Sequence, residues 1–192
     1  MFGGMRILAP LLLVAGSAFG IEKPDYEVLE KEKQLELRKY ADIPVASAPM
    51  GGMGERNDSF RKLFRYIQGN NAAKQKIEMT SPVFMEPGAG EEAAPQAGRM
   101  SFMIPATVAK KGAPEPGGQE VNLDKIPGGK FAVIRFSGHR SEAKRTAAVE
   151  ALKAWVARKG WTSSGEPFFA YYDPPWTPEF MRRNEVWLRL EP

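Results

Sequence analysis

Apolar and polar residues alternate along several short stretches of this chain, with the period of two that is typical of β-strands. In the stretch at 184–190, Val186, Leu188 and Leu190 share one side, so a strand with one face on a core is expected. Pro44 indicates that the stretch at 43–48 either begins its strand at this proline or forms an edge strand. The other predicted strands are residues 26–31, 35–40, 43–48, 76–80, 83–85, 100–104, 130–136 and 168–172. The first two of these are expected to form a hairpin.

Two other stretches repeat with the 3.6-residue period of an amphipathic helix. The first can be capped by Asn57 or Asp58 and ends at Gly69. Its apolar stripe consists of Phe60, Leu63, Phe64 and Ile67. The second is capped by Ser141 and ends at Gly160. Its apolar face consists of Ala148, Leu152 and Trp155.

The predicted elements repeat once along the chain. Residues 43–104 and 131–190 each read as a strand, a helix and two further strands, although their sequences differ. Two β-α-β-β units with mostly antiparallel strands favour an α+β fold. We expect a distorted antiparallel β-barrel flanked by two helices.

The N-terminus has the pattern of a secretory signal. Arg6 precedes an apolar run from Ile7 to Ala15, and small residues at Ala18 and Gly20 suit cleavage after Gly20. We therefore interpret residues 1–20 as a signal peptide and 21–192 as a single domain that works in the periplasm or is secreted. The run is too short for a transmembrane helix, so no stable membrane span is expected after cleavage. An uncleaved membrane anchor is the alternative.

Composition narrows the chemistry. The chain has 192 residues, no cysteine and one histidine, His139, which excludes disulfides, Cys-ligated metals and sites built from several imidazoles. Its net charge of +4 is spread among interleaved acidic and basic residues, so no nucleic-acid partner is predicted. A protein partner is neither indicated nor excluded.

No catalytic constellation stands out. A nucleophilic triad, a phosphate loop and a pair of carboxylates are all missing from the sequence pattern. Arg182, Arg183, Asn184 and Glu185 resemble a catalytic cluster, but a structural role is favoured. In that interpretation Arg183 and Glu185 share one side of a strand and bracket the proline-rich turn, while Asn184 bonds the backbone of the turn. Asp173 starts the turn.

Four motifs resemble those of a known family. They are YIQGNN at 66–71, KIEMTSPV at 76–83, YDPP at 172–175 and RNEVW at 183–187. Their order and spacing are similar to those of the SOUL haem-binding family, and the resemblance extends from Tyr26 to Leu190. The chain is thereby identified as a bacterial, exported member of that family. The resemblance implies a distorted barrel flanked by two helices and a haem or tetrapyrrole site, without covalent attachment, in an apolar cleft beside the first helix.

The first helix offers residues of the right chemistry for such a site. The resemblance carries over Phe60, Phe64 and Arg65, and helical geometry adds Arg61 beside them. Aromatic rings suit the flat apolar disc of haem, and an arginine can hold a propionate with two hydrogen bonds. The competing interpretation is that the phenylalanines are ordinary core and the arginines a solvated helix face.

Ligation of the iron is less well supported. Some relatives have been assigned a histidine where this chain has Lys39, and a protonated lysine is a poor iron ligand. His139 is a candidate haem-iron ligand, although an exposed or capping role near a helix N-terminus is favoured. Met79 and Met85 are also possible ligands, but packing in the core is the favoured interpretation.

The function that these observations favour is non-catalytic haem or porphyrin binding, by a carrier, buffer or scavenger outside the cytoplasm. An effector-binding module for another apolar small molecule is the first alternative, since a fold does not fix a ligand. A haem-dependent, peroxidase-like enzyme is the less favoured second alternative.

Overall fold

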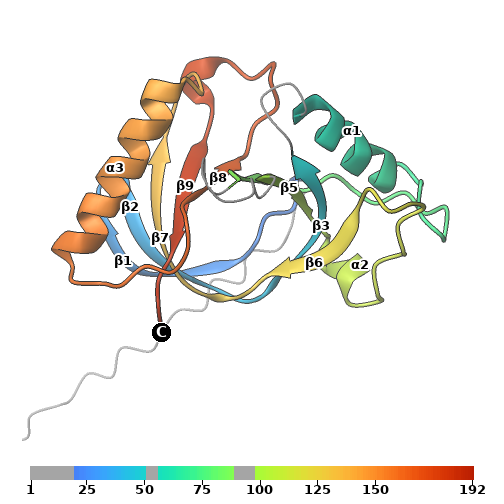
Figure 1. Ribbon diagram of the computed structural model, residues 1–192, viewed down its shortest axis with the longest axis horizontal. Coiled ribbons are helices and arrows are strands. Elements are labelled where there is room, and N and C mark those ends of the chain that lie inside the picture. Colours follow the sequence, from blue (N-terminus) through green and yellow to red (C-terminus); the bar gives the residue numbers. More distant parts are fainter. Residues whose placement is uncertain (1–19, 51–55, 89–97) are drawn as a thin grey trace, which may run out of the picture.

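The computed structural model describes residues 20–50, 56–88 and 98–192, and it shows one antiparallel sheet with helices packed on it (Figure 1). The nine strands are β1 (Tyr26–Glu32), β2 (Leu35–Tyr40), β3 (Ile43–Met50), β4 (Val83–Glu86), β5 (Gly98–Met103), β6 (Asn122–Ile126), β7 (Gly129–Phe136), β8 (Phe168–Tyr171) and β9 (Asn184–Arg189). The helices are α1 (Arg56–Ile67), the short α2 (Ala106–Ala109) and α3 (Glu142–Arg158), followed by a 3-10 turn at Glu179–Met181. The predicted α+β class is confirmed.

The order of the elements repeats as the sequence pattern predicts. β3-α1-β4-β5 is followed by β7-α3-β8-β9, and the two units join where β4 pairs with β8. The β1–β2 hairpin extends the sheet beyond β7, and β6 extends it beyond β3. The full strand order is β1-β2-β7-β9-β8-β4-β5-β3-β6.

The sheet is strongly curved but open. Figure 1 shows α3 and α1 on its outer side, at opposite ends of the molecule; α3 packs on β7 and β9, and α1 packs on β3 and β5. In the part of the chain that the structure describes, β1 and β6 are the end strands and do not pair with each other. The sheet is therefore not closed, and the predicted barrel is not confirmed.

Both faces of the sheet are buried along β9. The concave face carries an aromatic cluster that includes Trp187, Phe131 and Phe168. Val186 and Leu188 point to the other face, where α3 covers them. The predicted alternation is confirmed, but the expectation of a single buried face is wrong, because α3 gives the second face a core of its own.

Two expectations around α1 are also corrected. The helix begins at Arg56, so Asn57 and Asp58 lie in its first turn instead of capping it. Residues 76–80 form no sheet ladder: the Ile77 amide donates to the carbonyl of Ile67 at 2.8 Å, at the end of α1. The Thr80 hydroxyl donates to the Met103 carbonyl of β5 at 2.6 Å, so irregular hydrogen bonds hold this segment between α1 and the sheet.

Other expectations hold, and two elements were not foreseen. Ser141 caps α3, since its hydroxyl accepts a hydrogen bond from the Lys144 amide at 3.4 Å. β3 begins at Ile43 and is paired on both sides, so Pro44 marks its start and not an edge. β6 and α2 were not predicted, because both are short and lie beside proline and glycine residues.

Candidate ligand-binding site

α1 presents one face to the sheet and leaves the other free. Leu63, Tyr66 and Ile67 are buried against β3 and β5. The Ser59 hydroxyl donates to the Pro49 carbonyl at 2.7 Å, and the Tyr66 hydroxyl donates to the Pro114 carbonyl at 2.9 Å. Burial, with a smaller effect of a nearby glutamate, raises the pKa of Tyr66 to about 12, so it remains a donor at neutral pH. These contacts fix the orientation of the exposed face.

Phe60 and Phe64 form an aromatic strip on that exposed face. Their side chains are 39% and 44% exposed, and their rings lie 6.0 Å apart and nearly parallel, at 13°. Phe60 also packs edge-on against the buried ring of Phe102, at 5.2 Å between centroids. The apolar stripe of the sequence therefore divides: Leu63 and Ile67 join the core, whereas the two phenylalanines keep part of their apolar surface exposed.

The two predicted arginines of α1 are exposed and weakly paired. Arg61 lies 3.5 Å from Asp58, and Arg65 lies 3.2 Å from Glu120. Lys62 contacts the same Glu120 carboxylate at 3.4 Å, so two cations share one anion. Exposed pairs of this kind contribute about 0–1 kcal/mol each, which leaves the arginines free to exchange a partner for a ligand carboxylate. Their role in binding stays a prediction.

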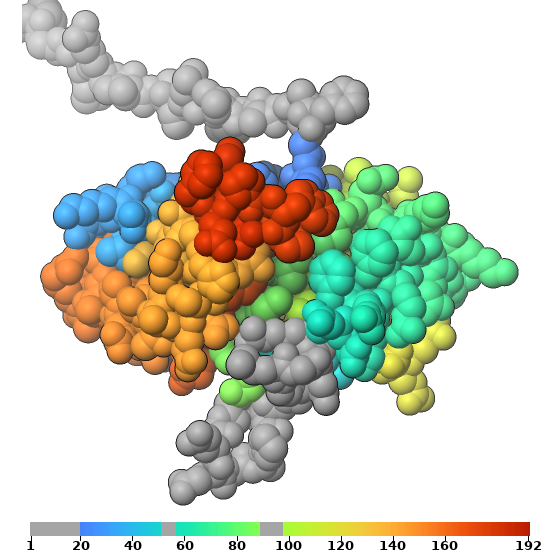
Figure 2. Space-filling view, turned by 90° about the horizontal axis from the view of Figure 1, so that it is seen from above, coloured from blue at the N-terminus to red at the C-terminus, as the bar shows by residue number. Residues whose placement is uncertain are grey.

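A second exposed apolar surface lies on the C-terminal loop, residues 172–183. Trp176, Phe180 and Met181 are 82%, 79% and 62% exposed. Figure 2 shows this red loop and the teal α1 on the same face of the molecule, with a green part of the chain between them. Monomeric proteins seldom leave several large apolar side chains exposed in one region without a binding role. Sequence reasoning missed these residues, although three large apolar side chains in a proline-rich turn are a readable signal.

The C-terminal loop is held in shape by arginine side chains. Arg182 donates to the carbonyls of Pro175 at 2.5 Å and Thr177 at 2.8 Å. The Asp173 carboxylate accepts from the Arg183 amide at 2.6 Å, which confirms that Asp173 organises the turn. The loop therefore displays its apolar side chains from a bonded frame.

Arg140 places a further cation at the base of this loop. It donates to the Asn184 side chain at 3.2 Å and to the Asp173 carbonyl at 2.9 Å, and it stacks on Tyr171 at 4.1 Å. Within the described residues, no carboxylate lies within 4.0 Å of its guanidinium. Burial, reinforced by Arg182 nearby, lowers the pKa of Arg140. An anion at this position would therefore pair with the Arg140 guanidinium, which is already partly removed from water.

Beneath the loop lies an ion cluster formed by the buried Arg38 and Glu185 and the partly exposed Arg183. Arg38 grips the Glu185 carboxylate with two hydrogen bonds, at 2.9 and 3.1 Å, and Arg183 donates to it at 2.9 Å. Tyr172 and Trp187 also donate to it, at 3.0 and 2.8 Å. Desolvation raises the pKa of Glu185, but the arginines outweigh it and hold the pKa below its ordinary value.

The ion cluster agrees with the structural interpretation of Arg183 and Glu185, which pair with each other at 2.9 Å. The Glu185 carboxylate is fully buried and accepts five hydrogen bonds from protein side chains, as expected of a group that holds segments together. Asn184 differs from expectation: its amide donates to the Gly138 carbonyl at 3.2 Å, outside the proline-rich turn. It therefore ties β9 to the segment before α3.

The candidate iron ligands do not converge. His139 is exposed in the segment before α3, and Lys39 is exposed on β2. Met79 and Met85 are half-buried and pack against the cluster beneath α1. Across residues 20–50, 56–88 and 98–192, no three His, Cys, Asp or Glu side chains group as metal ligands. Iron ligation by His139 stays a prediction.

No helix within the described ranges is both long and apolar enough to cross a membrane. The predicted signal peptide falls almost entirely on residues 1–19, which lie outside the described residues. Its cleavage stays a prediction.

Comparison with known proteins gives relatives along nearly the whole chain. Heme-binding protein 1 of Mus musculus is 28% identical over 190 residues, covering 98% of this chain and 94% of that protein. Heme-binding protein 2 of Homo sapiens is 27% identical over 182 residues, covering 90% and 87%. Among solved structures, EcmrR in a complex with DNA has a TM-score of 0.61 at 14% identity; the match covers 82% of this chain but only 57% of that one. At such low identity this likeness concerns the fold alone.

The family profile described as SOUL heme-binding protein matches residues 21–189. That range includes α1, the C-terminal loop and the ion cluster, and the four sequence motifs lie within it. The chain belongs to the SOUL heme-binding protein family.

Proposed function

We propose that this protein binds haem or a related tetrapyrrole, non-covalently, on the face that carries α1 and the C-terminal loop. The observation that carries the proposal is the exposure of large apolar side chains on both segments, Phe60 and Phe64 on one and Trp176 and Phe180 on the other. Two relatives named as heme-binding proteins support the choice of ligand.

The residues on this face suit the chemistry of the ligand. A tetrapyrrole is a flat apolar disc with carboxylates on one edge, so its site needs an apolar surface and nearby cations. The aromatic strip provides the surface. The proposed partners of the propionates are Arg61 and Arg65 on α1, which are only weakly paired, and Arg140 at the base of the C-terminal loop. Apolar contact and ion pairing supply the binding energy, with no protein ligand to the iron required.

The proposed role is that of a non-catalytic carrier, buffer or scavenger. A surface site held between a helix and a loop suits reversible binding, because the ligand can leave without opening of the core. The leader-like pattern at residues 1–20 supports a location in the periplasm or outside the cell.

Titration with haemin tests the proposal. We expect a red shift of the Soret band that saturates at one haemin per chain, together with quenching of tryptophan fluorescence. Trp176 is the most exposed of the large apolar side chains, so Trp176→Phe should keep the Soret shift and lose much of the quenching. A titration with neither a Soret shift nor quenching would refute haem binding, and native mass spectrometry would then be used to seek another apolar ligand.

Arg65→Glu is expected to weaken haemin binding about tenfold, the order of one charge-assisted hydrogen bond of ~1.5 kcal/mol. Glu120→Gln should strengthen binding a few-fold, because it releases Arg65 and Lys62 from the carboxylate that they share. Lys33→Glu, an equal change of charge in the β1–β2 turn, serves as the control. The ester of the same porphyrin, whose propionates are blocked, should bind Arg65→Glu and the unmodified chain alike. Equal haemin affinity in Arg65→Glu would exclude this arginine from the site.

A further inference from the structure

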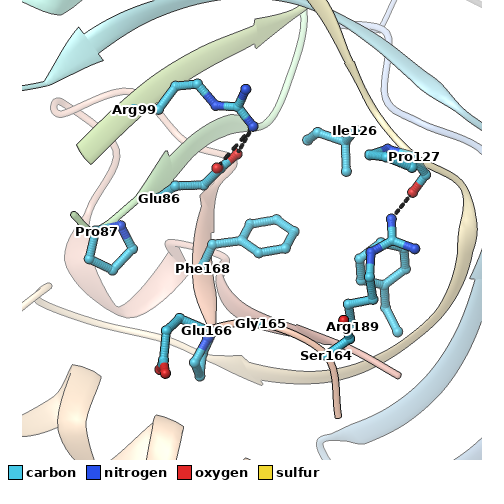
Figure 3. Close-up of a pocket in the computed structure, with 12 residues that line it drawn as sticks. Glu86, Pro87, Arg99, Ile126, Pro127, Ser164, Gly165, Glu166, Phe168 and Arg189 are labelled. Atoms are coloured by element: carbon cyan, nitrogen blue, oxygen red, sulfur yellow. Dashed lines mark hydrogen bonds and ion pairs between the residues drawn. The ribbon is translucent and has the colours of Figure 1, made fainter. Parts of the chain in front are cut away.

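A separate pocket of about 330 Å³ opens on another part of the molecule. Figure 3 shows it between the end of β4, the start of β5, the β6–β7 turn and the segment before β8. No described residue of α1 or of the C-terminal loop lines it. Ligand pockets commonly measure roughly 300–1,000 Å³, so this one suits a small molecule and is too small to enclose a tetrapyrrole.

The floor of the pocket is aromatic. Phe131 and Phe168 meet edge to face, with centroids 6.2 Å apart, and Ile126 lies beside them. All three side chains belong to the buried cluster on the concave face of the sheet. In Figure 3 the ring of Phe168 projects into the middle of the pocket. Phe131 is fully buried, so a flat apolar molecule would rest on the ring of Phe168, which the core supports from beneath.

Arg189 supplies a cation at one wall. Its guanidinium stacks on the Phe131 ring at 4.6 Å and donates to the Gly128 carbonyl at 2.9 Å and to the carbonyl of Pro127. Within the described ranges no carboxylate lies within 4.0 Å of it. Asp42 acts on it from a longer distance and is itself paired with Lys125 at 2.5 Å. Backbone carbonyls orient the guanidinium, but they do not neutralise its charge.

On the opposite wall, the cation Arg99 is already paired with two acidic side chains. Arg99 is held by Glu86, at 2.9 Å to both carboxylate oxygens, and by Asp124 at 2.6 Å. These three side chains together carry one net negative charge. Glu166, at the rim, lies 3.6 Å from Lys153. An incoming anion is therefore attracted to Arg189 and repelled from the Glu86 side.

We infer that this pocket binds a small aromatic monocarboxylate, with its ring on Phe168 and its carboxylate on Arg189. The N–H groups of Arg189 that are not bonded to the turn can donate to a ligand carboxylate. That carboxylate brings the negative charge that the neutral carbonyls of the turn lack. The acidic wall disfavours a second carboxylate at the far end of the ligand. This site is independent of the proposed haem site, because the two share no described residue.

2-Naphthoate is a suitable probe for the full-length chain, followed by calorimetry and by amide chemical shifts. We expect saturable binding that shifts the amides of Gly128, Gly165 and Phe168 and leaves α1 unmoved. 2-Naphthylmethanol, with the same ring and no charge, should bind at least tenfold more weakly. Naphthalene-2,6-dicarboxylate should also bind more weakly. Equal affinity for the acid and the alcohol would overturn the proposal.

Variants of the wall and the mouth complete the test. Arg189→Gln should lower the affinity for 2-naphthoate by at least tenfold, and Arg189→Lys should restore part of it. Because Arg189 also supports the β6–β7 turn, Ser164→Trp offers a second route: Ser164 is exposed, and a larger side chain there fills the pocket while Arg189 stays in place. Unchanged affinity in Ser164→Trp would refute the assignment.

Saturating haemin should leave the affinity for 2-naphthoate unchanged, whereas competition between them would overturn the claim of two sites. Binding of 2-naphthoate by a chain that fails to bind haemin would leave this inference standing while the proposed function falls.

Discussion

Glu185→Gln is expected to lower the free energy of unfolding by about 3–5 kcal/mol, the range for breaking a buried ion pair from one side. The carboxylate is fully buried and accepts hydrogen bonds from Arg38, Arg183, Tyr172 and Trp187. A neutral amide leaves the buried guanidinium of Arg38 without its principal counter-ion, and its NH₂ group faces donors. Chemical denaturation followed by circular dichroism measures the change.

A double substitution separates the ion pair from the packing around it. Arg38→Met combined with Glu185→Leu removes the fully buried pair and keeps apolar volume, and it leaves only the partly exposed Arg183 without its carboxylate, so it should cost less than Glu185→Gln alone. The matched control is Glu166→Gln, where the carboxylate is 73% exposed and only a surface pair is lost. A loss below about 1 kcal/mol in Glu185→Gln would contradict the view that this cluster holds β2, β9 and the C-terminal loop together.

The same cluster gives the stability a defined pH dependence. The pKa of Glu185 in the folded protein lies below its ordinary value of 4.5, so its ionised form stabilises the fold above that pH. This contribution disappears as the pH falls through the lower, folded-state pKa. The stability difference between the unmodified chain and Glu185→Gln should therefore be largest near pH 7 and shrink below about pH 4. Glu36, whose pKa is also lowered, pairs with the same Arg38 at 2.7 Å, so the comparison is made with Glu36→Gln in both proteins.

The sequence was informative wherever local chemistry decides structure. The caps and the apolar face of α3 follow from Ser141 and the spacing of Leu152 and Trp155, and the structure confirms them. The same spacing on α1 predicted a stripe but did not show which members turn inward. That choice depends on how α1 sits over β3 and β5, which buries Leu63 and leaves Phe64 at the edge.

Long-range contacts were beyond the reach of sequence reasoning. Arg38 and Glu185 are separated by 147 positions, and neither is marked locally as a partner of the other. The pocket at Arg189 draws its walls from five segments, so no single stretch of sequence encodes it. Closure of the sheet was also not decidable from strand patterns, because it depends on whether the end strands β1 and β6 meet.

The double substitution Phe60→Ser and Phe64→Ser is expected to weaken haemin binding by roughly 100-fold or more. Each ring exposes about two-fifths of its surface, and covering such an area of apolar surface contributes on the order of 2 kcal/mol. Because the rings are already exposed, the substitution should cost little stability; the main loss is the contact of Phe60 with Phe102. Soret titrations of the single and double variants measure the effect.

A control of equal exposure makes this test specific to α1. Leu29 on β1 is 41% exposed, and β1 is the end strand of the sheet on the side away from β3 and β5, on which α1 packs. Leu29→Ser should therefore leave haemin affinity unchanged. If Leu29→Ser and the double variant weakened binding equally, haemin would be adsorbing to apolar surface in general. If the double variant kept full affinity while Trp176→Ser lost it, the ligand would rest on the C-terminal loop alone. Loss in both Trp176→Ser and the double variant, with Leu29→Ser unchanged, is the result expected if haem is held between α1 and the loop.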